Sequence, residues 1–142
     1  MFLFDLFKLF KPKKRKAKVR KGISGISKRA KSPKIEALRK QAKKILPARL
    51  EELARKHGFK YGKVAIRNAK TRWGSCSYRN NINLNLHLAR LEPELVDYVI
   101  MHELCHTIEK NHSARFWALL HKHLPNATEL RKRLKTVKLV IK

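Results

Sequence analysis

Two histidines four positions apart, in the segment HELCH at residues 102–106, constrain this chain more than any other feature. On an α-helix such residues lie one turn apart on the same face, so His102 and His106 can reach one metal ion together. Apolar residues recur at helical spacing along this segment, at Leu95, Val96, Val99, Ile100 and Leu104. This spacing predicts a helix that packs into the core. The chain must therefore fold so that a rigid, buried helix presents a metal site.

Glu103 and His112 supply the other chemical groups expected of this segment. Glu103 directly follows the first histidine, so its carboxylate can contact a metal-bound water without occupying a coordination position. His112, six residues after His106, is expected near the start of the next helix. There it would complete a three-histidine site with a fourth position open to water, as in catalytic zinc sites. Glu109 and Asp97 are alternative third ligands, and a polar helix-start residue is the alternative role for His112.

Basic residues dominate the composition, since 36 Lys and Arg and 10 Asp and Glu give a net charge of +26. Such an excess indicates a polyanionic partner, either nucleic acid or an anionic membrane surface. Ribosomal proteins share this composition, so charge alone does not distinguish an enzyme from a nucleic-acid-binding module. The two cysteines, Cys76 and Cys105, form no C-x-x-C pair, which suits a reducing, cytoplasmic location. Both are interpreted as packing residues, because Cys105 is out of phase with His106 on the helix.

Residues 1–34 are predicted to form a flexible basic arm ahead of a folded domain at residues 35–142. Residues 1–10 are mostly apolar, whereas residues 11–34 carry twelve bases and no acid and cannot fold alone. This order resembles a peripheral membrane anchor over residues 1–20, with packing on the domain or disorder as alternatives. It is the reverse of a secretory signal, and no apolar run reaches the roughly 18 residues of a membrane span. The remaining domain still carries 23 bases and 9 acids, a net charge of +14.

Four helices are predicted from apolar residues at three- and four-residue steps. They cover residues 34–56, 91–109, 114–123 and 126–135. Pro47 is expected to kink or divide the first helix, and Asn111 or Ser113 to cap the third.

Three strands are predicted between the first two helices, and together these elements indicate an α+β fold. The strands cover residues 63–69, 71–78 and 81–88, and the last alternates strictly between apolar and polar residues. They are expected to form a small antiparallel sheet with one face on the helices. His87 lies on the polar side of this pattern and is expected to be exposed. The remaining histidines, His57, His121 and His123, are also interpreted as surface residues.

Three motifs in order make the chain resemble a known family. They are TRWGSC at residues 71–76, the run NINLNLHLARLEPELVDYVI at residues 81–100, and HELCH followed by NHSARFW. The chain resembles the YgjP-like metallopeptidases, relatives of the SprT-like zinc peptidases, over about residues 35–136. The resemblance implies a minimal zincin-type metallopeptidase fold, with His102, His106 and His112 as zinc ligands and Glu103 as catalytic base. It also places the segment at residues 72–75 near the cleft, where a peptide can add as an extra strand.

The leading hypothesis is a zinc metallopeptidase that cleaves proteins or peptides, with Glu103 as general base. The SprT-like relatives suggest DNA-associated proteins as substrates, reached through phosphate contacts of the basic surface and arm. The alternative is a basic nucleic-acid-binding module whose metal site is structural, and a third hypothesis is a protease held on an anionic membrane by residues 1–20. Arg72, Arg115 or a tyrosine remain open as the oxyanion-stabilising group. The substrate, the cleaved bond and the oligomeric state are left open.

Overall fold

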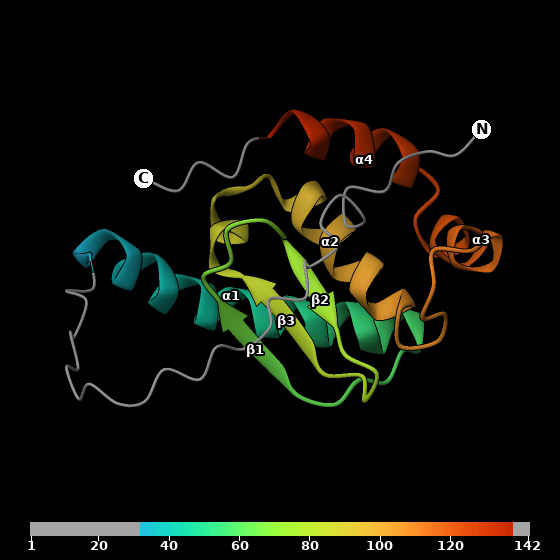
Figure 1. The fold of residues 1–142 in the computed structure, drawn as a ribbon, viewed down its shortest axis with the longest axis horizontal. Coiled ribbons are helices and arrows are strands. Elements are labelled where there is room, and N and C mark those ends of the chain that lie inside the picture. The colour runs from blue at the N-terminus through green and yellow to red at the C-terminus, as the bar shows by residue number, and fades with distance from the viewer. Residues whose placement is uncertain (1–31, 138–142) are drawn as a thin grey trace, which may run out of the picture.

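Four helices and a three-stranded sheet make up the fold in the computed structural model, which describes residues 32–137 (Figure 1). The elements are α1 (Pro33–His57), β1 (Val64–Arg67), β2 (Gly74–Cys76), β3 (Ile82–Asn85), the 3₁₀ turn η1 (Leu86–Arg90), α2 (Pro93–Cys105), α3 (Ala114–His123) and α4 (Ala127–Thr136). The predicted α+β class is therefore confirmed. Residues 1–31 of the predicted arm lie outside the described residues, so its boundary and its membrane contact stay predictions.

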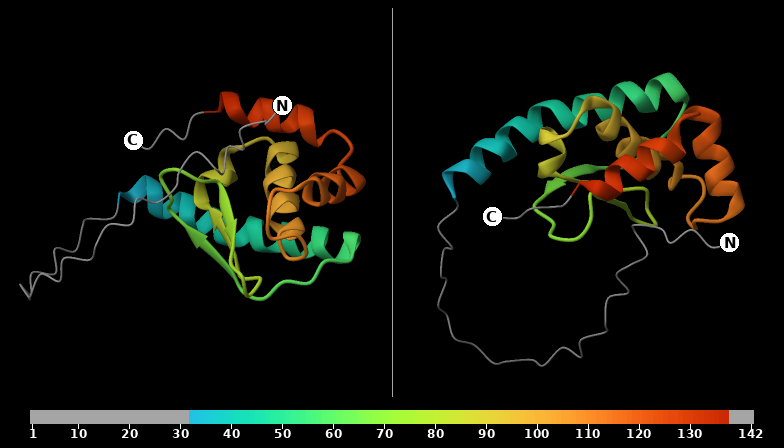
Figure 2. Two further views of the ribbon diagram at one scale, coloured as in Figure 1. Left: turned by 45° about the vertical axis from the view of Figure 1, so that its right-hand side comes forward. Right: turned by 90° about the horizontal axis from the view of Figure 1, so that it is seen from above.

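Helix α1 runs along one side of the molecule and supports the sheet, η1 and α2 (Figure 2). Its buried residues recur every three or four positions, at Leu38, Ala42, Leu46, Leu50, Leu53 and Ala54. Pro47 lies inside this helix without dividing it, although its ring removes one backbone donor. Gly58 ends the helix in the left-handed conformation, at φ 75°, and its amide donates to the carbonyl of Ala54.

The sheet is mixed, not antiparallel as the sequence predicted. Its strand order is β1-β3-β2, with β1 parallel and β2 antiparallel to β3. After β1 the chain crosses to the far side of β3 before it returns as β2. The side-chain amide of Asn85, at the end of β3, donates to the carbonyls of Ala69 and Arg72 at 2.8 and 2.9 Å and so holds this crossing.

Strand β3 ends earlier than predicted, and this changes the environment of His87. Asn85 caps the turn η1, because its side-chain oxygen accepts from the amide of His87 at 3.0 Å. The chain leaves the sheet there, so the alternation of the strand no longer decides which side chains face solvent. His87 is buried, 5% exposed, with its Nε2 3.3 Å from Oδ1 of Asn68. The prediction that His87 is exposed was wrong, and burial lowers the pKa of its imidazole.

Helix α2 is the centre of the fold, since it contacts α1, α3, α4, β2 and β3. It begins at Pro93, two residues after the predicted start at Leu91, and ends at Cys105, four residues before the predicted end at Glu109. The Thr107 hydroxyl donates to the carbonyl of Leu104 at 2.6 Å, and the amide of Glu109 reaches the carbonyl of Cys105 at 2.9 Å. The amides of Thr107 and Ile108 donate to carbonyls three residues back, at 3.0 and 3.1 Å, so the α-helical pattern gives way to a tighter turn.

Helices α3 and α4 follow their predicted ranges closely and pack beside α2. Ser113 is the residue before α3, as one of the two predicted caps, but its side chain makes no capping bond. Arg133 of α4 pairs with Glu94 at 2.7 Å and with Glu92, which attaches α4 to the start of α2. Within the described part of the chain, every helix is too short or too polar to cross a lipid bilayer.

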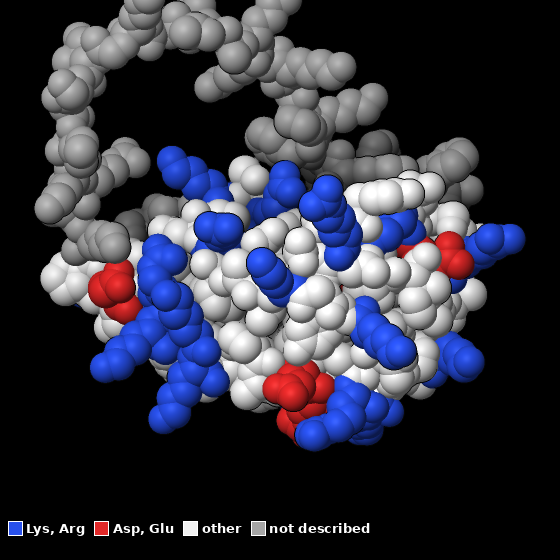
Figure 3. Space-filling view, turned by 90° about the horizontal axis from the view of Figure 1, so that it is seen from below, with Lys and Arg blue, Asp and Glu red and all other residues white. Residues whose placement is uncertain are grey.

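Basic side chains are spread over the surface in separate groups (Figure 3). On the face shown, acidic side chains appear at only a few places among the described residues. The positive charge therefore belongs to the folded part of the protein as well as to the N-terminal segment.

Candidate metal centre

The last turn of α2 and the residue that follows it carry two of the three predicted ligands, His102 and His106. His102 and His106 are 0% and 8% exposed, and their Nε2 atoms lie 3.1 Å apart. Residues four apart on a helix point the same way, so this convergence follows directly from the sequence spacing. The first two site residues are therefore positioned by one rigid, buried element.

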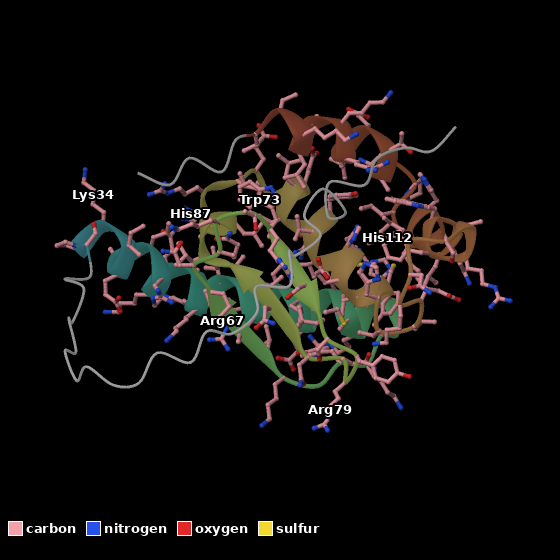
Figure 4. All side chains as sticks on the ribbon, in the orientation of Figure 1. Lys34, Arg67, Trp73, Arg79, His87 and His112 are labelled. Atoms are coloured by element: carbon pink, nitrogen blue, oxygen red, sulfur yellow. The ribbon has the colours of Figure 1, made fainter. Side chains whose placement is uncertain are left out.

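His112 reaches the same point from the turn between α2 and α3 (Figure 4). Its Nε2 lies 3.1 Å from Nε2 of His102 and 2.9 Å from Nε2 of His106. The early end of α2 produces this arrangement, because the chain must reverse within a few residues to bring His112 back. Among residues 32–137, this is the group whose donor atoms gather closely enough to share one metal ion.

The geometry of the three rings fits a tetrahedral metal ion. Zinc bonded to imidazoles at about 2.0–2.1 Å places its nitrogen ligands about 3.3 Å apart, close to the observed separations. Nδ1 of His106 lies 2.9 Å from the carbonyl oxygen of Glu109, which can only accept, so this nitrogen carries the proton. Nε2 of the neutral ring then presents its lone pair to the shared centre. Neutral imidazoles of this kind suit zinc and also copper, iron or nickel.

Aromatic side chains of α3 form the wall behind the histidines. Phe116 is fully buried and stacks on His106, with ring centroids 4.4 Å apart and planes at 22°. Its ring also meets the edges of His102 and His112 at 4.8 and 5.0 Å. Trp117 lies 6.1 Å from His112, and the guanidinium of Arg131 covers the Trp117 ring at 4.7 Å. These contacts restrict the imidazole rings to the orientations that converge.

Glu103 is buried, 2% exposed, and borders a pocket of about 330 Å³ that also reaches His106 and His112. The other described residues lining this pocket are Arg72, Gly74, Ser75, Cys76 and Lys110. Strand β2 thus forms one side of the pocket and the end of α2 the other. This places the carboxylate beside the histidine cluster but outside it, as the sequence predicted.

Both alternative third ligands have other roles. The carboxylate of Asp97 receives two hydrogen bonds from the Arg49 guanidinium, at 2.8 and 2.7 Å. Glu109 contributes only its backbone carbonyl, to His106. Of the groups proposed for oxyanion stabilisation, Arg72 lines the pocket, whereas neither Arg115 nor a tyrosine is among the described lining residues.

The remaining candidate residues lie away from the site or in the core. His57 and His123 face each other with their Nδ1 atoms 3.1 Å apart, so they are partly buried partners and not isolated surface residues. Trp73 is 4% exposed and belongs to the hydrophobic core. Cys105 is fully buried, and burial raises the pKa of its thiol to about 12. Lys110 was missed, because no motif marks a lysine in the turn that follows α2.

Comparison with known proteins agrees with this geometry. The family model for the YgjP-like metallopeptidase domain matches residues 9–137. The chain belongs to this family. The match begins inside the segment that the sequence assigns to the basic arm.

Two solved structures resemble this YgjP-like metallopeptidase. The metallopeptidase zymogen of Pyrococcus abyssi abylysin is 30% identical, with 65% of this chain and 93% of that chain covered at a TM-score of 0.58. The metallopeptidase zymogen of Methanocaldococcus jannaschii jannalysin is 22% identical, with 63% and 93% covered at a TM-score of 0.56. Among curated proteins, none matches significantly. The fold of this YgjP-like protein is thus that of minimal metallopeptidases, and a protein or peptide is its substrate.

Proposed function

We propose that the protein is a zinc-dependent peptidase in which His102, His106 and His112 hold the ion and Glu103 is the general base. The observation that carries the proposal is the convergence of three Nε2 atoms within 3.1 Å of one another beside a pocket that Glu103 borders. An ion held by these three nitrogens would keep a fourth coordination position for water, the arrangement of catalytic and not structural zinc.

Glu103 has the environment that a general base for water requires. When bound, zinc supplies a Lewis acid that makes a water molecule far more acidic. The Glu103 carboxylate accepts the proton of the attacking water and later passes it to the departing amine. Because Glu103 is 2% exposed, little bulk water competes for the carboxylate.

Strand β2 is suited to align the peptide. It pairs with β3 on one side, at Gly74↔Leu84, Ser75↔Asn83 and Cys76↔Ile82, and stands last in the strand order. Its outer backbone edge can therefore bind an extended substrate as an additional strand. The same three residues of β2 line the pocket, so a peptide bound there passes directly over Glu103.

The decisive experiment compares Glu103→Gln with wild type in metal analysis and casein hydrolysis. We expect about one zinc per chain in both proteins and a loss of activity by about 10²–10⁴-fold in the variant. Glu109→Gln is the matched control, because the described role of Glu109 involves its backbone carbonyl. Equal metal content with no hydrolysis by wild type would favour the alternative of a nucleic-acid-binding module with a structural metal. An active Glu103→Gln would instead assign the general base to another group.

Association with DNA-bound substrates is the finer part of the proposal. Its support is the net charge of +14 over residues 35–142 together with the exposed basic side chains. Phosphate contacts would raise local substrate concentration and weaken steeply with salt. Hydrolysis measured with and without DNA at two salt concentrations tests this. The membrane hypothesis is tested separately, by deleting residues 1–20 and measuring whether binding to liposomes is lost.

A further inference from the structure

We infer that the pocket beside Glu103 is a subsite for an acidic side chain of the substrate, recognised by Arg72 and Lys110. This inference deepens the proposed function, because it names the peptides that the site prefers. The pocket of about 330 Å³ is large enough for an Asp or Glu side chain next to the bond that is cut.

Charge is unbalanced among the residues that line this pocket. Arg72 and Lys110 contribute two cations, and Glu103 contributes the one carboxylate among the described lining residues. Two cations against one carboxylate leave an excess of one positive charge in this lining. A metal ion on the three histidines adds further positive charge. An incoming carboxylate is therefore attracted, whereas a lysine side chain is repelled.

Lys110 is held in place by neutral groups. Its ammonium donates to the carbonyl of Ser77 at 3.2 Å and to the side-chain oxygen of Asn80, and it lies 5.7 Å above the Tyr78 ring. These contacts attach the turn after α2 to the turn between β2 and β3. They fix the position of the charge without cancelling it, so the ammonium remains able to attract an anion.

Arg72 faces the pocket from the start of β2. Its backbone is anchored, because its carbonyl accepts from the Asn85 side chain at 2.9 Å and the next residue, Trp73, is buried. Within residues 32–137, no ion pair involves the Arg72 guanidinium. A guanidinium can bind a carboxylate through two parallel hydrogen bonds, which gives direction as well as charge.

The test measures binding as well as cleavage. Capped peptides, acetylated and amidated, carry Glu, Gln or Lys at one position in an otherwise identical neutral sequence, so that the side chain is the sole source of charge. Binding to zinc-loaded Glu103→Gln is followed by fluorescence anisotropy at low salt. We expect the Glu peptide to bind about tenfold more tightly than the Gln peptide, and the Lys peptide most weakly.

Substitutions then assign the preference to the two cations. Arg72→Gln and Lys110→Gln should each reduce the Glu-to-Gln ratio to about threefold, and the double variant should abolish it. Lys110→Arg keeps the charge and should keep the ratio, which separates charge from a loosened turn. Arg55→Gln, on the exposed surface of α1, is the control that leaves the ratio unchanged. A role of Arg72 in oxyanion stabilisation alone would slow cleavage of all peptides equally and leave the binding ratio intact.

The outcomes separate this inference from the proposed function. Equal binding of Glu and Gln peptides, or a ratio that survives the double variant, overturns the acidic subsite even if wild type hydrolyses peptides. Selective binding of the Glu peptide without hydrolysis by wild type supports the subsite and overturns the peptidase mechanism. A free C-terminal carboxylate on the Gln peptide provides a last comparison. If it restores tight binding as well as Glu does, a chain terminus and not an acidic side chain is the ligand.

Discussion

A β-carbon on Gly74 would lie 3.0 Å from both Cγ and Oε1 of Glu103. The backbone of β2 therefore packs directly on the carboxylate that we assign as general base. The backbone carbonyl oxygen of Asn83, on β3, would lie 3.2 Å from the same β-carbon, so the added group is also crowded by the neighbouring strand. Glycine at this position sets the distance between the substrate-binding strand and Glu103.

Replacing Gly74 by alanine should displace the Glu103 side chain by a few tenths of an ångström. Because proton transfer depends closely on geometry, we expect kcat to fall by about tenfold or more with zinc content unchanged. Steady-state kinetics and metal analysis of the same preparation measure both quantities. Ser75→Ala, on the same strand, adds no atoms and should leave kcat close to wild type. An unchanged kcat in Gly74→Ala would show that the contact does not position the base.

Phe116→Leu should weaken metal binding as well as stability. The variant removes the ring that stacks on His106 at 4.4 Å and should cost about 1 kcal/mol of unfolding free energy. The freed imidazoles lose their fixed orientation, so zinc affinity should drop several-fold in competition with a chelator. Leu120→Val, also buried in α3, is the control for a destabilised helix. Equal zinc affinity in the two variants would contradict a role of Phe116 in ligand orientation.

The contact between His57 and His123 predicts a pH dependence of stability. Burial lowers the pKa of both imidazoles, and Lys56 and Lys122 act in the same direction. The unfolded chain therefore binds more protons than the native state near pH 6. The contribution of this histidine pair to the free energy of unfolding is fully present above the unfolded pKa of about 6.5 and is lost as the pH falls below it.

Unfolding in urea at pH 7.5 and pH 5 measures this effect. We expect the destabilisation caused by His57→Gln to be larger at pH 7.5 than at pH 5. For His121→Gln, on the same helix as His123, the destabilisation should differ less between the two pH values than it does for His57→Gln. A constant difference between wild type and His57→Gln across this range would mean that the pair does not titrate as described.

The ion pair between Arg49 and Asp97 should contribute modestly to the attachment of α1 to α2. Its two hydrogen bonds, at 2.8 and 2.7 Å, are well aligned, but the Arg49 side chain is 38% exposed. A double-mutant cycle of Arg49→Ala and Asp97→Ala in urea unfolding should give a coupling of about 0.5–1 kcal/mol. The coupling should shrink in 1 M salt. Zinc content should not change, because Asp97 is not a ligand.

The two cysteines should differ in reactivity. Cys105 is fully buried, whereas Cys76 is half-buried in the wall of the pocket. Burial also raises the pKa of the Cys76 thiol, so it should react slowly at neutral pH. Titration with a thiol reagent should find one slowly reacting group in the folded protein and two after denaturation. In Cys76→Ser, no thiol should react until the protein unfolds.

Local patterns accounted for the helices and for most of the site. The spacing of His102 and His106 is a property of one helix, so their convergence needed no knowledge of the rest of the chain. The position of His112 was harder, because it depends on where α2 ends. The predicted end at Glu109 would have carried the chain away from the cluster. The helix ends earlier, where the amides of Thr107 and Ile108 bond to carbonyls three residues back.

The sheet could not be predicted from strand periodicity alone. Alternation identifies a strand but does not say which neighbour it pairs with, so the parallel pairing of β1 and β3 was missed. The burial of His87 also could not be predicted from strand periodicity. One side chain, Asn85, caps the turn after β3, and the residues beyond it follow tertiary packing instead of the strand pattern.

His102 and His112 are separated by ten positions, and the segment between them turns the chain from α2 into α3. An ion held by the two rings, as we propose, would close this short loop much as a disulfide would and would remove conformational freedom that the unfolded chain otherwise keeps. Occupancy of the metal site and the order of the turn between α2 and α3 would then depend on each other. A chelator would remove the reactive centre and at the same time loosen the wall of the cleft that surrounds it.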